Sequence, residues 1–282
     1  MRPLFVVILL SLTISAASAG SSGFANVNGT KLYYETAGKG RTVVFIHGGL
    51  VDSRLWDDQF KVFARKFRVV RYDLRGYGRS EFPTAAFSHV EDLYALLQYL
   101  KVKKASLVGL SVGSSVAMEF ALAHPEMVEK IILTSAGLRG SKLPPNKQNL
   151  AIYKAAEEKG MEMAIGMWLE SDLFATAKGN DRFVKRTRQM LADNYKYWGP
   201  TPRPIPETWP KPPTAERLSE LKSSTLIIVG EKDAKTILDT ADILKEKIAA
   251  VVMVTIPGVS HHLNMENPKE YNRIVIEFLK RP

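Results

Sequence analysis

The sequence predicts one domain of the α/β class: a mostly parallel sheet with helices on both faces, interrupted by a helical lid insertion. Two observations predict this class. Short apolar, β-branched runs alternate with amphipathic stretches of helical length from residue 24 onward. Most of the runs are unbroken, as expected for parallel strands that helices cover on both faces. The 282 residues, 45% of them hydrophobic and 24% charged, match an ordinary globular domain.

The apolar runs define the expected sheet. Strands are predicted at residues 31–35, 42–47, 68–73, 105–110, 130–135, 225–230 and 251–256. The chain from Phe24 to Glu35 is instead polar and turn-rich, and Asn28-Gly29 stands ahead of Lys31. This pattern predicts an antiparallel hairpin at the edge of the sheet.

The amphipathic stretches define the expected helices. Core helices are predicted at residues 53–64, 90–100, 112–123, 237–248 and 268–279. The strand-helix alternation stops between Leu138 and Lys222, where helical patterns cover residues 148–159, 161–169 and 181–195. We therefore expect a core of residues 20–137 and 223–282, with residues 138–222 as a helical lid over the carboxyl edge of the sheet. Trp168 and Trp198 are expected either to line a pocket or to pack the core of this insertion.

The first nineteen residues have the features of a secretory signal peptide. Arg2 supplies a positive start, residues 4–14 form an apolar run, and Ala17-Ser18-Ala19 is a small-x-small cleavage signal before Gly20. The apolar run is shorter than the roughly 20 residues that a spanning helix needs. We expect an exported protein, periplasmic or secreted, with no stable membrane anchor after cleavage.

Composition and motif spacing exclude several classes of chemistry. There is no cysteine, which excludes disulfides, thiolate metal sites and cysteine nucleophiles. No histidine or carboxylate cluster has metal-ligand spacing, and Gly76-Tyr77-Gly78 lacks the third glycine of a dinucleotide fingerprint. Lys and Arg outnumber Asp and Glu by 39 to 29, yet no nucleic-acid-binding motif accompanies the excess. We expect no metal, no cofactor and no nucleic acid, and a small molecule as partner.

A serine lies at the turn from a predicted buried strand into a predicted helix. Gly109-Leu110-Ser111-Val112-Gly113 has the G-x-S-x-G pattern, in which small neighbours permit a sharp turn that exposes the hydroxyl. Ser111 is the candidate nucleophile, and the alternative is an unreactive serine that caps the helix.

A serine nucleophile needs a base, and the base needs an orienting acid. His261 and His262 follow the last predicted strand at the carboxyl edge, so one of them is the candidate base. Asp233 follows another strand and is the candidate acid, with Glu231 as its main rival. Capping or surface positions are expected for His89, which precedes a predicted helix, and for His124, which ends one. A structural role is expected for His47.

The last component is a pair of donors for an oxyanion. His47-Gly48-Gly49-Leu50 follows an early strand. The backbone N–H groups of Gly49 and of Val112, the residue after the serine, could form the two-donor hole that stabilises a tetrahedral intermediate.

Four segments together resemble lid-bearing proteins of the α/β-hydrolase fold, of the esterase, lactonase and cofactor-free perhydrolase type. They are residues 43–49, residues 73–80, the Gly109–Gly113 turn, and Gly258-Val259-Ser260-His261 with Met265-Glu266-Asn267-Pro268. The resemblance implies Ser111 as nucleophile, Asp233 as acid, and the N–H groups of Gly49 and Val112 as oxyanion donors. In the family pattern the histidine follows Gly-x-Gly; Ser260 replaces the last glycine here, and this register favours His261 over His262.

These observations predict an exported serine hydrolase that cleaves a small or medium carboxylic ester or lactone through an acyl-enzyme intermediate. The alternatives are a ligand-binding or sensing protein with little turnover, and a cofactor-free perhydrolase or carbon–carbon hydrolase. Residues 139–222 carry fifteen Lys and Arg against ten Asp and Glu. This excess predicts either a solvated basic face or a preference for anionic substrates.

Overall fold

The computed structural model describes residues 20–200 and 207–281. Its core is one eight-stranded sheet with the strand order β1-β2-β4-β3-β5-β6-β7-β8. The strands are β1 (Ser21–Val27), β2 (Thr30–Ala37), β3 (Thr42–Ile46), β4 (Arg68–Tyr72), β5 (Ala105–Leu110), β6 (Val128–Thr134), β7 (Ser224–Gly230) and β8 (Val251–Ile256). The β1–β2 and β2–β4 pairs are antiparallel, and the other five pairs are parallel.

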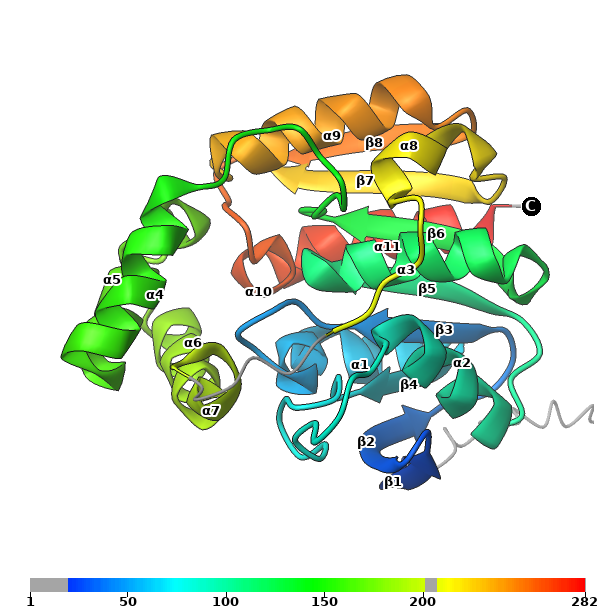
Figure 1. Ribbon diagram of the computed structural model, residues 1–282. Coiled ribbons are helices and arrows are strands. Elements are labelled where there is room, and N and C mark those ends of the chain that lie inside the picture. Colours follow the sequence, from blue (N-terminus) through cyan, green and yellow to red (C-terminus); the bar gives the residue numbers. More distant parts are fainter. Residues whose placement is uncertain (1–19, 201–206, 282) are drawn as a thin grey trace, which may run out of the picture.

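Helices cover both faces of this sheet (Figure 1). The α-helices of the core are α1 (Asp57–Ala64), α2 (His89–Tyr99), α3 (Val112–Ala123), α9 (Lys235–Lys247), α10 (Leu263–Glu266) and α11 (Pro268–Lys280), with short 3-10 turns η1 (Ser53–Trp56) and η2 (Pro125–Met127). The side chains of α1 and α11 pack on one face, and those of α2, α3 and α9 pack on the other.

The alternation of side chains along β3 explains the two hydrophobic layers. Val43 and Phe45 belong to the layer under α1 and α11, whereas Val44 and Ile46 belong to the layer under α2 and α3. All four are buried because successive side chains of a strand point to opposite faces. An unbroken apolar run is therefore what a central strand needs.

The chain leaves the sheet after β6 and returns at β7. The described elements between them are α4 (Lys147–Lys159), α5 (Met161–Leu169), η3 (Asp172–Phe174), α6 (Asp181–Asp193), α7 (Tyr195–Trp198), α8 (Thr214–Arg217) and η4 (Leu218–Glu220). Helices α4 to α7 lie beyond the carboxyl ends of the strands, to the left in Figure 1. Trp168 and Trp198 are buried in a hydrophobic layer that these helices share with the core. Of the two expectations for these residues, packing rather than lining a pocket is therefore observed.

The predicted fold class is confirmed, including the edge hairpin, which turns at Asn28 and Gly29 with positive φ. The predicted helix at 53–64 divides into η1 and α1, and the Asp52 side chain caps the first turn of η1 at Arg54. The predicted signal peptide, residues 1–19, lies outside the described residues. Within the described ranges, no helix is long and apolar enough to cross a membrane.

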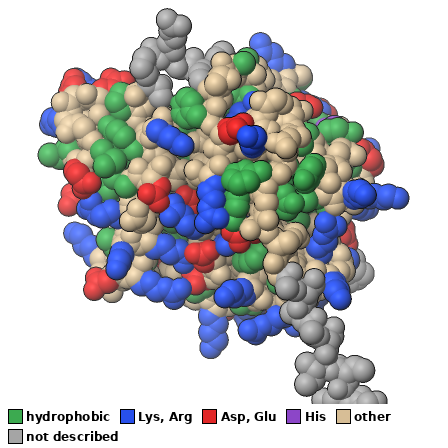
Figure 2. All heavy atoms as spheres, turned by 90° about the horizontal axis from the view of Figure 1, so that it is seen from below, with side chains coloured by type: hydrophobic (Ala, Val, Ile, Leu, Met, Phe, Trp, Pro, Cys, Tyr) green, Lys and Arg blue, Asp and Glu red, His purple; other side chains and the backbone are tan. Residues whose placement is uncertain are grey.

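The face seen from below in Figure 2 carries Lys and Arg side chains over most of its width. Asp and Glu side chains lie among them, together with scattered hydrophobic ones. On this face the positive charge is therefore distributed rather than gathered in one patch, which is typical of a solvated surface.

Candidate active site

Ser111 occupies a strained turn between β5 and α3. Its φ of 53° and ψ of −113° lie where non-glycine residues are rarely found. The turn is tight: a Cβ atom added to Gly109 would lie 2.3 Å from the carbonyl oxygen of Gly113. The Ser111 N–H donates to the carbonyl of Thr134 at 3.0 Å, which ties the turn to β6. This geometry leaves Ser111 half-exposed at the carboxyl edge of the sheet.

Asp233 and His261 form a buried pair beside this edge. The Nδ1 atom of His261 lies 3.1 and 3.2 Å from the two carboxylate oxygens of Asp233. The Asp233 loop follows β7 and the His261 loop follows β8, and the two loops meet at Gly230. A Cβ atom on Gly230 would lie 2.4 Å from the carbonyl oxygens of Val259 and Ser260, so glycine permits this approach. The Asp233 carboxylate thereby orients the ring so that its Nε2 atom is the one free to act as a base.

The three predicted triad residues thus come from the carboxyl ends of β5, β7 and β8, as the sequence predicts. The structure pairs Asp233 with His261, but no hydrogen bond of the described residues joins Ser111 to His261. Such contacts are often loose without a substrate and tighten in the reacting complex.

His262 points into a different environment from His261. Its ring stacks on Phe174 of η3, with centroids 4.6 Å apart and an interplanar angle of 18°, and lies 6.0 Å from Phe183 of α6. Burial lowers the pKa of His262 well below its usual value, and its Nδ1 atom has no hydrogen-bond partner within residues 20–200 and 207–281. His262 therefore packs against the insertion as a neutral aromatic side chain.

The rival candidates have other partners. The Glu231 carboxylate accepts a hydrogen bond from the N–H of Gly258 at 3.0 Å, whereas the hydrogen bonds of the His261 ring in the described structure go to Asp233. The Nδ1–H of His47 donates to the carbonyl of Gly48 at 2.7 Å, and its Nε2 accepts the N–H of Leu74 at 2.9 Å. Burial lowers the pKa of His47, so the ring is a neutral structural link between two loops.

The loop after β3 lies against the turn at Ser111. A Cβ atom on Gly48 would lie 3.5 Å from the Cβ atom of Ser111, and one on Gly49 would lie 3.4 Å from Cγ2 of Val112. No hydrogen bond of the described residues uses the N–H of Gly49 or that of Val112. These two N–H groups lie beside Ser111 and remain the candidate oxyanion donors.

The turn at Gly76-Tyr77-Gly78 also faces this region. The Tyr77 hydroxyl is 3.9 Å from the Cβ position of Gly49, and its ring packs edge-on against His47 and 4.0 Å from the ring of Tyr197 in α7. Burial raises the pKa of Tyr77, so the phenol stays protonated. The turn therefore lies beside the loop that carries Gly49.

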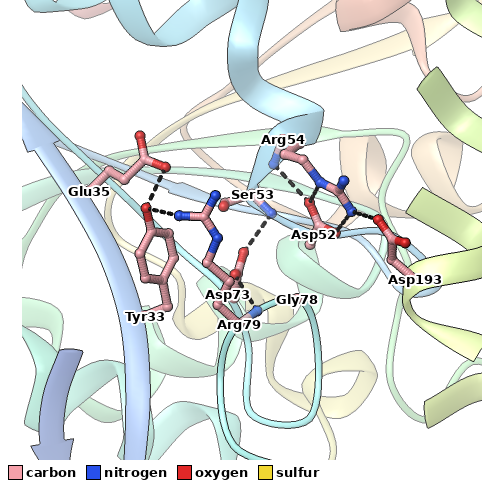
Figure 3. A pocket seen from close by; sticks show the side chains of 9 residues that line it. All are labelled: Tyr33, Glu35, Asp52, Ser53, Arg54, Asp73, Gly78, Arg79 and Asp193. Carbon is pink, nitrogen blue, oxygen red and sulfur yellow. Dashed lines mark hydrogen bonds and ion pairs between the residues drawn. The ribbon is translucent and has the colours of Figure 1, made fainter. Parts of the chain in front are cut away.

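A polar cluster joins the insertion to the core near the loop after β3 (Figure 3). Arg54 bonds to Asp52 at 2.6 Å and to Asp193 of α6 at 2.8 Å. Asn194 donates to Asp52 at 2.9 Å and accepts the N–H of Gly78 at 2.7 Å. This cluster borders a pocket of about 210 Å³, which is lined by Tyr33, Glu35, Asp52, Ser53, Arg54, Asp73, Gly78, Arg79 and Asp193.

The carboxylates of this cluster are already satisfied. Asp73 accepts the N–H groups of Ser53 at 2.8 Å and Arg79 at 2.9 Å. Burial, followed by the charge of Asp52, raises the pKa of Asp73. Because these polar groups bind one another and neither Ser111 nor His261 lines the pocket, we interpret the cluster as a structural joint.

A second pair of polar side chains, His89 and Glu207, joins the start of α2 to the insertion. His89, expected at a capping or surface position, is instead buried at the start of α2, because Glu207 covers it with an oxygen 3.5 Å from Nε2. Burial lowers the pKa of His89 to about 3 and raises that of Glu207 to about 7. The surface expectation for His89 is wrong, since residues far apart in sequence enclose it.

Sequence reasoning assigned no role to Glu266 or to Asn194, both of which bridge the insertion and the core. Glu266 stands in the segment Met265-Glu266-Asn267-Pro268, so a signal for it was present. For Asn194 the sequence carries no comparable signal. In the described part of the chain, no group of three or more His, Asp and Glu side chains could hold a metal ion.

Comparison with known families matches residues 43–274 to a family described as the alpha/beta hydrolase family. The chain belongs to this family. An uncharacterised protein of Mycobacterium tuberculosis is 35% identical over 143 residues, which cover 46% of this chain and 42% of that protein. The chain therefore aligns with less than half of that relative.

Two further alpha/beta hydrolase relatives cover most of the chain. A 2-hydroxy-6-oxononadienedioate/2-hydroxy-6-oxononatrienedioate hydrolase of Pseudomonas putida is 26% identical over 95% of this chain and 100% of its own. The solved structure of an N-acyl homoserine lactone degrading enzyme is 25% identical, with a TM-score of 0.74 over 91% of this chain and 100% of that one. The match thus extends through the insertion as well as the sheet.

Proposed function

We propose that this protein is a serine hydrolase that cleaves a small or medium carboxylic ester or lactone. The observation that carries the proposal is the strained, half-exposed Ser111 at the edge where Asp233 orients His261. The relationship to a lactone-degrading enzyme supports the substrate class.

The reaction has two halves. Ser111 Oγ attacks the carbonyl carbon while His261 Nε2 takes the hydroxyl proton, and the N–H groups of Gly49 and Val112 bind the oxyanion. The tetrahedral intermediate collapses, the carbon–oxygen bond breaks, and His261 returns the proton to the leaving alcohol. A water molecule then attacks the acyl-enzyme with His261 as base, which releases the acid and restores Ser111.

Ser111→Ala provides the test of this proposal. Turnover of a p-nitrophenyl acyl ester and of a lactone panel is expected to fall by about three orders of magnitude or more, because the covalent route is lost. Near-normal turnover by Ser111→Ala would contradict the assignment. Tight binding of ligands without turnover by the unaltered protein would favour the sensing alternative.

A carbon–carbon hydrolase is the second candidate, and the relative from Pseudomonas putida favours it because that relationship covers 95% of this chain. The same triad and oxyanion donors would serve it. Including a 2-hydroxy-6-oxo-dienoate in the substrate panel separates the two: kcat/KM higher for this substrate than for every ester and lactone would select the second candidate. Adding hydrogen peroxide to the ester assay tests the perhydrolase alternative.

We also propose that the protein is exported. The proposal rests on the signal-peptide features of residues 1–19. N-terminal sequencing of native protein is expected to begin at Gly20, and a start at Met1 would contradict export.

A further inference from the structure

Glu266 holds the loop that carries His261 on both sides of that residue. One carboxylate oxygen accepts the N–H of Ser260 at 2.8 Å, and the other accepts the N–H of His262 at 3.1 Å. The hydroxyl of Ser260 lies 3.0 Å from the second oxygen. Hydrogen bonds from charged acceptors are stronger than neutral ones, so this single side chain fixes the backbone immediately before and after His261.

The insertion completes the arrangement. The hydroxyl of Thr176, two residues beyond η3, donates to the Glu266 carboxylate and lies 3.0 Å from Oγ of Ser260. Phe174 of the same segment stacks on His262. The insertion therefore contacts both sequence neighbours of His261, one through a hydrogen bond and the other through an aromatic ring.

Ser260 is central to this contact. A glycine at position 260 would supply its backbone N–H to Glu266, but it would have no hydroxyl for Thr176 to approach. The hydroxyl of Ser260 also lies 3.4 Å from the carbonyl oxygen of Leu173 in η3. The hydroxyl of Ser260 thus connects the His261 loop of the core to the segment of the insertion that contains Leu173 and Thr176.

We propose that Thr176, Ser260 and Glu266 form a latch through which the docked insertion positions His261 for catalysis. The three are positioning residues, because they act on the backbone of the His261 loop and contact neither the serine nor the reacting atoms. The consequence is that His261 is held in its working orientation when the segment around Thr176 is docked. A displacement of about 1 Å at a catalytic group is enough to cost a large part of the rate.

The inference rests on the proposed function, in which His261 is the base. Thr176→Val tests it with little change in shape, because the substitution replaces only the hydroxyl by a methyl group. We expect kcat for a p-nitrophenyl ester to fall about tenfold, or about 1.4 kcal/mol of barrier, with KM within about twofold of that of the unaltered protein. Thr176→Ser restores the hydroxyl and is expected to keep at least half of the original kcat.

Thr187→Val is the matched control. Thr187 is a buried threonine of α6 in the same insertion, and among the described residues its hydroxyl has no hydrogen-bond partner. Its kcat and KM are expected to equal those of the unaltered protein. Ser260→Gly is expected to lower kcat by a smaller factor than Thr176→Val, because the hydrogen bond from Thr176 to Glu266 remains. The double variant is expected to lose less than the product of the two single losses, because both changes act on the same latch.

The outcomes separate the two proposals. If Ser111→Ala inactivates the protein and Thr176→Val behaves like Thr187→Val, the latch is wrong and the proposed function stands. If Ser111→Ala keeps its activity, the proposed function is wrong. A Thr176→Val variant that raises KM with kcat unchanged would assign Thr176 to substrate binding and would also overturn the latch.

Discussion

The core and the insertion place their side chains by different physical means. In the core, strand ladders and close glycine contacts fix the candidate site: the Ser111 N–H bonds to β6, and Gly230 lets two loops meet. The insertion docks largely through side chains, such as Arg54 with Asp193 and Arg186 with Asp58. Backbone contacts resist change, whereas docking through side chains can be broken one group at a time. Backbone contacts therefore fix much of the candidate site, whereas individual side-chain contacts attach the insertion.

The largest expected effect tests the candidate site in the core. His261→Ala is expected to lower kcat by about three orders of magnitude or more, because the base is lost. His262→Ala is expected to change kcat by less than about tenfold, since that ring packs against the insertion rather than Asp233. Steady-state kinetics of both variants on one ester measures the ranking. The reverse ranking would transfer the catalytic role to His262.

A glycine of the elbow provides the next test. Gly113→Ala would place a Cβ atom 2.2 Å from the carbonyl oxygen of Ile46. We expect the free energy of unfolding to fall by about 2 to 3 kcal/mol, because the backbone of β3 must move to relieve the clash. Chemical denaturation measures this loss. Gly166→Ala in α5 is the control for a helical glycine in open space, because an added Cβ atom would meet nothing within 4 Å and φ there is not positive. An equal loss there would remove the packing argument.

The attachment of the insertion is tested at Arg186. Its guanidinium binds Asp58 at 2.6 Å and contacts the carbonyls of Arg54 and Leu55. Arg186→Met keeps the aliphatic stem and removes these bonds, so α6 is expected to lose about 2 kcal/mol of local protection in amide hydrogen exchange. Strands β3, β5 and β6 should keep their protection.

Arg188→Met serves as the control on the same helix, because Arg188 pairs with Glu162 at an exposed position within the insertion. It is expected to leave the protection of α6 within about 0.5 kcal/mol of the unaltered value. Equal loss in both variants, or loss that spreads into the sheet, would contradict a separately attached insertion.

The sequence predicted the core well because periodicity and local chemistry specify it. The strand at 105–110 and the helix at 112–123 have the bounds of β5 and α3, and the serine at their junction lies on a strained turn as predicted. The contacts of the insertion were not predictable in the same way. Thr176 meets Glu266 across ninety positions of sequence. Glu266 belongs to a recognisable segment, but that segment does not indicate which distant residue it contacts.

His89 illustrates the same limit. Its position before a predicted helix indicates a cap or a surface site, and only the folded chain brings Glu207 over it. Patterns along the chain report which face of an element is apolar. They do not report which distant polar group covers a particular side chain.

The contact of His89 with Glu207 leads to a prediction of how stability depends on pH. Burial raises the pKa of Glu207 to about 7 from 4.5, so the stability that its proton contributes is present below about pH 4.5 and is lost as pH rises through 7. The free energy of unfolding of Glu207→Gln relative to the unaltered protein should therefore rise over this window. After allowance for the partial exposure of Glu207, we expect this difference in unfolding free energy to rise by about 1 to 2 kcal/mol. Urea denaturation at pH 5, 6, 7 and 8 measures it, and a difference independent of pH would be inconsistent with a buried carboxyl.

The smallest expected effect concerns the charge of the insertion. If the excess of five cations in residues 139–222 steers anionic substrates, kcat/KM for a carboxylate-bearing ester should fall with added salt a few-fold more than for a neutral ester of equal size. Equal salt dependence for both esters would assign the excess to solvation alone.

The central claim, that Ser111 is activated by His261 to form a covalent acyl-enzyme, is tested most directly by trapping. The protein is treated with a fluorophosphonate, and the modified peptide is identified by mass spectrometry. We predict one adduct on Ser111, with labelling slowed by at least about a hundredfold in His261→Ala and little changed in His262→Ala. No adduct on Ser111, or labelling at the same rate without His261, would contradict the account.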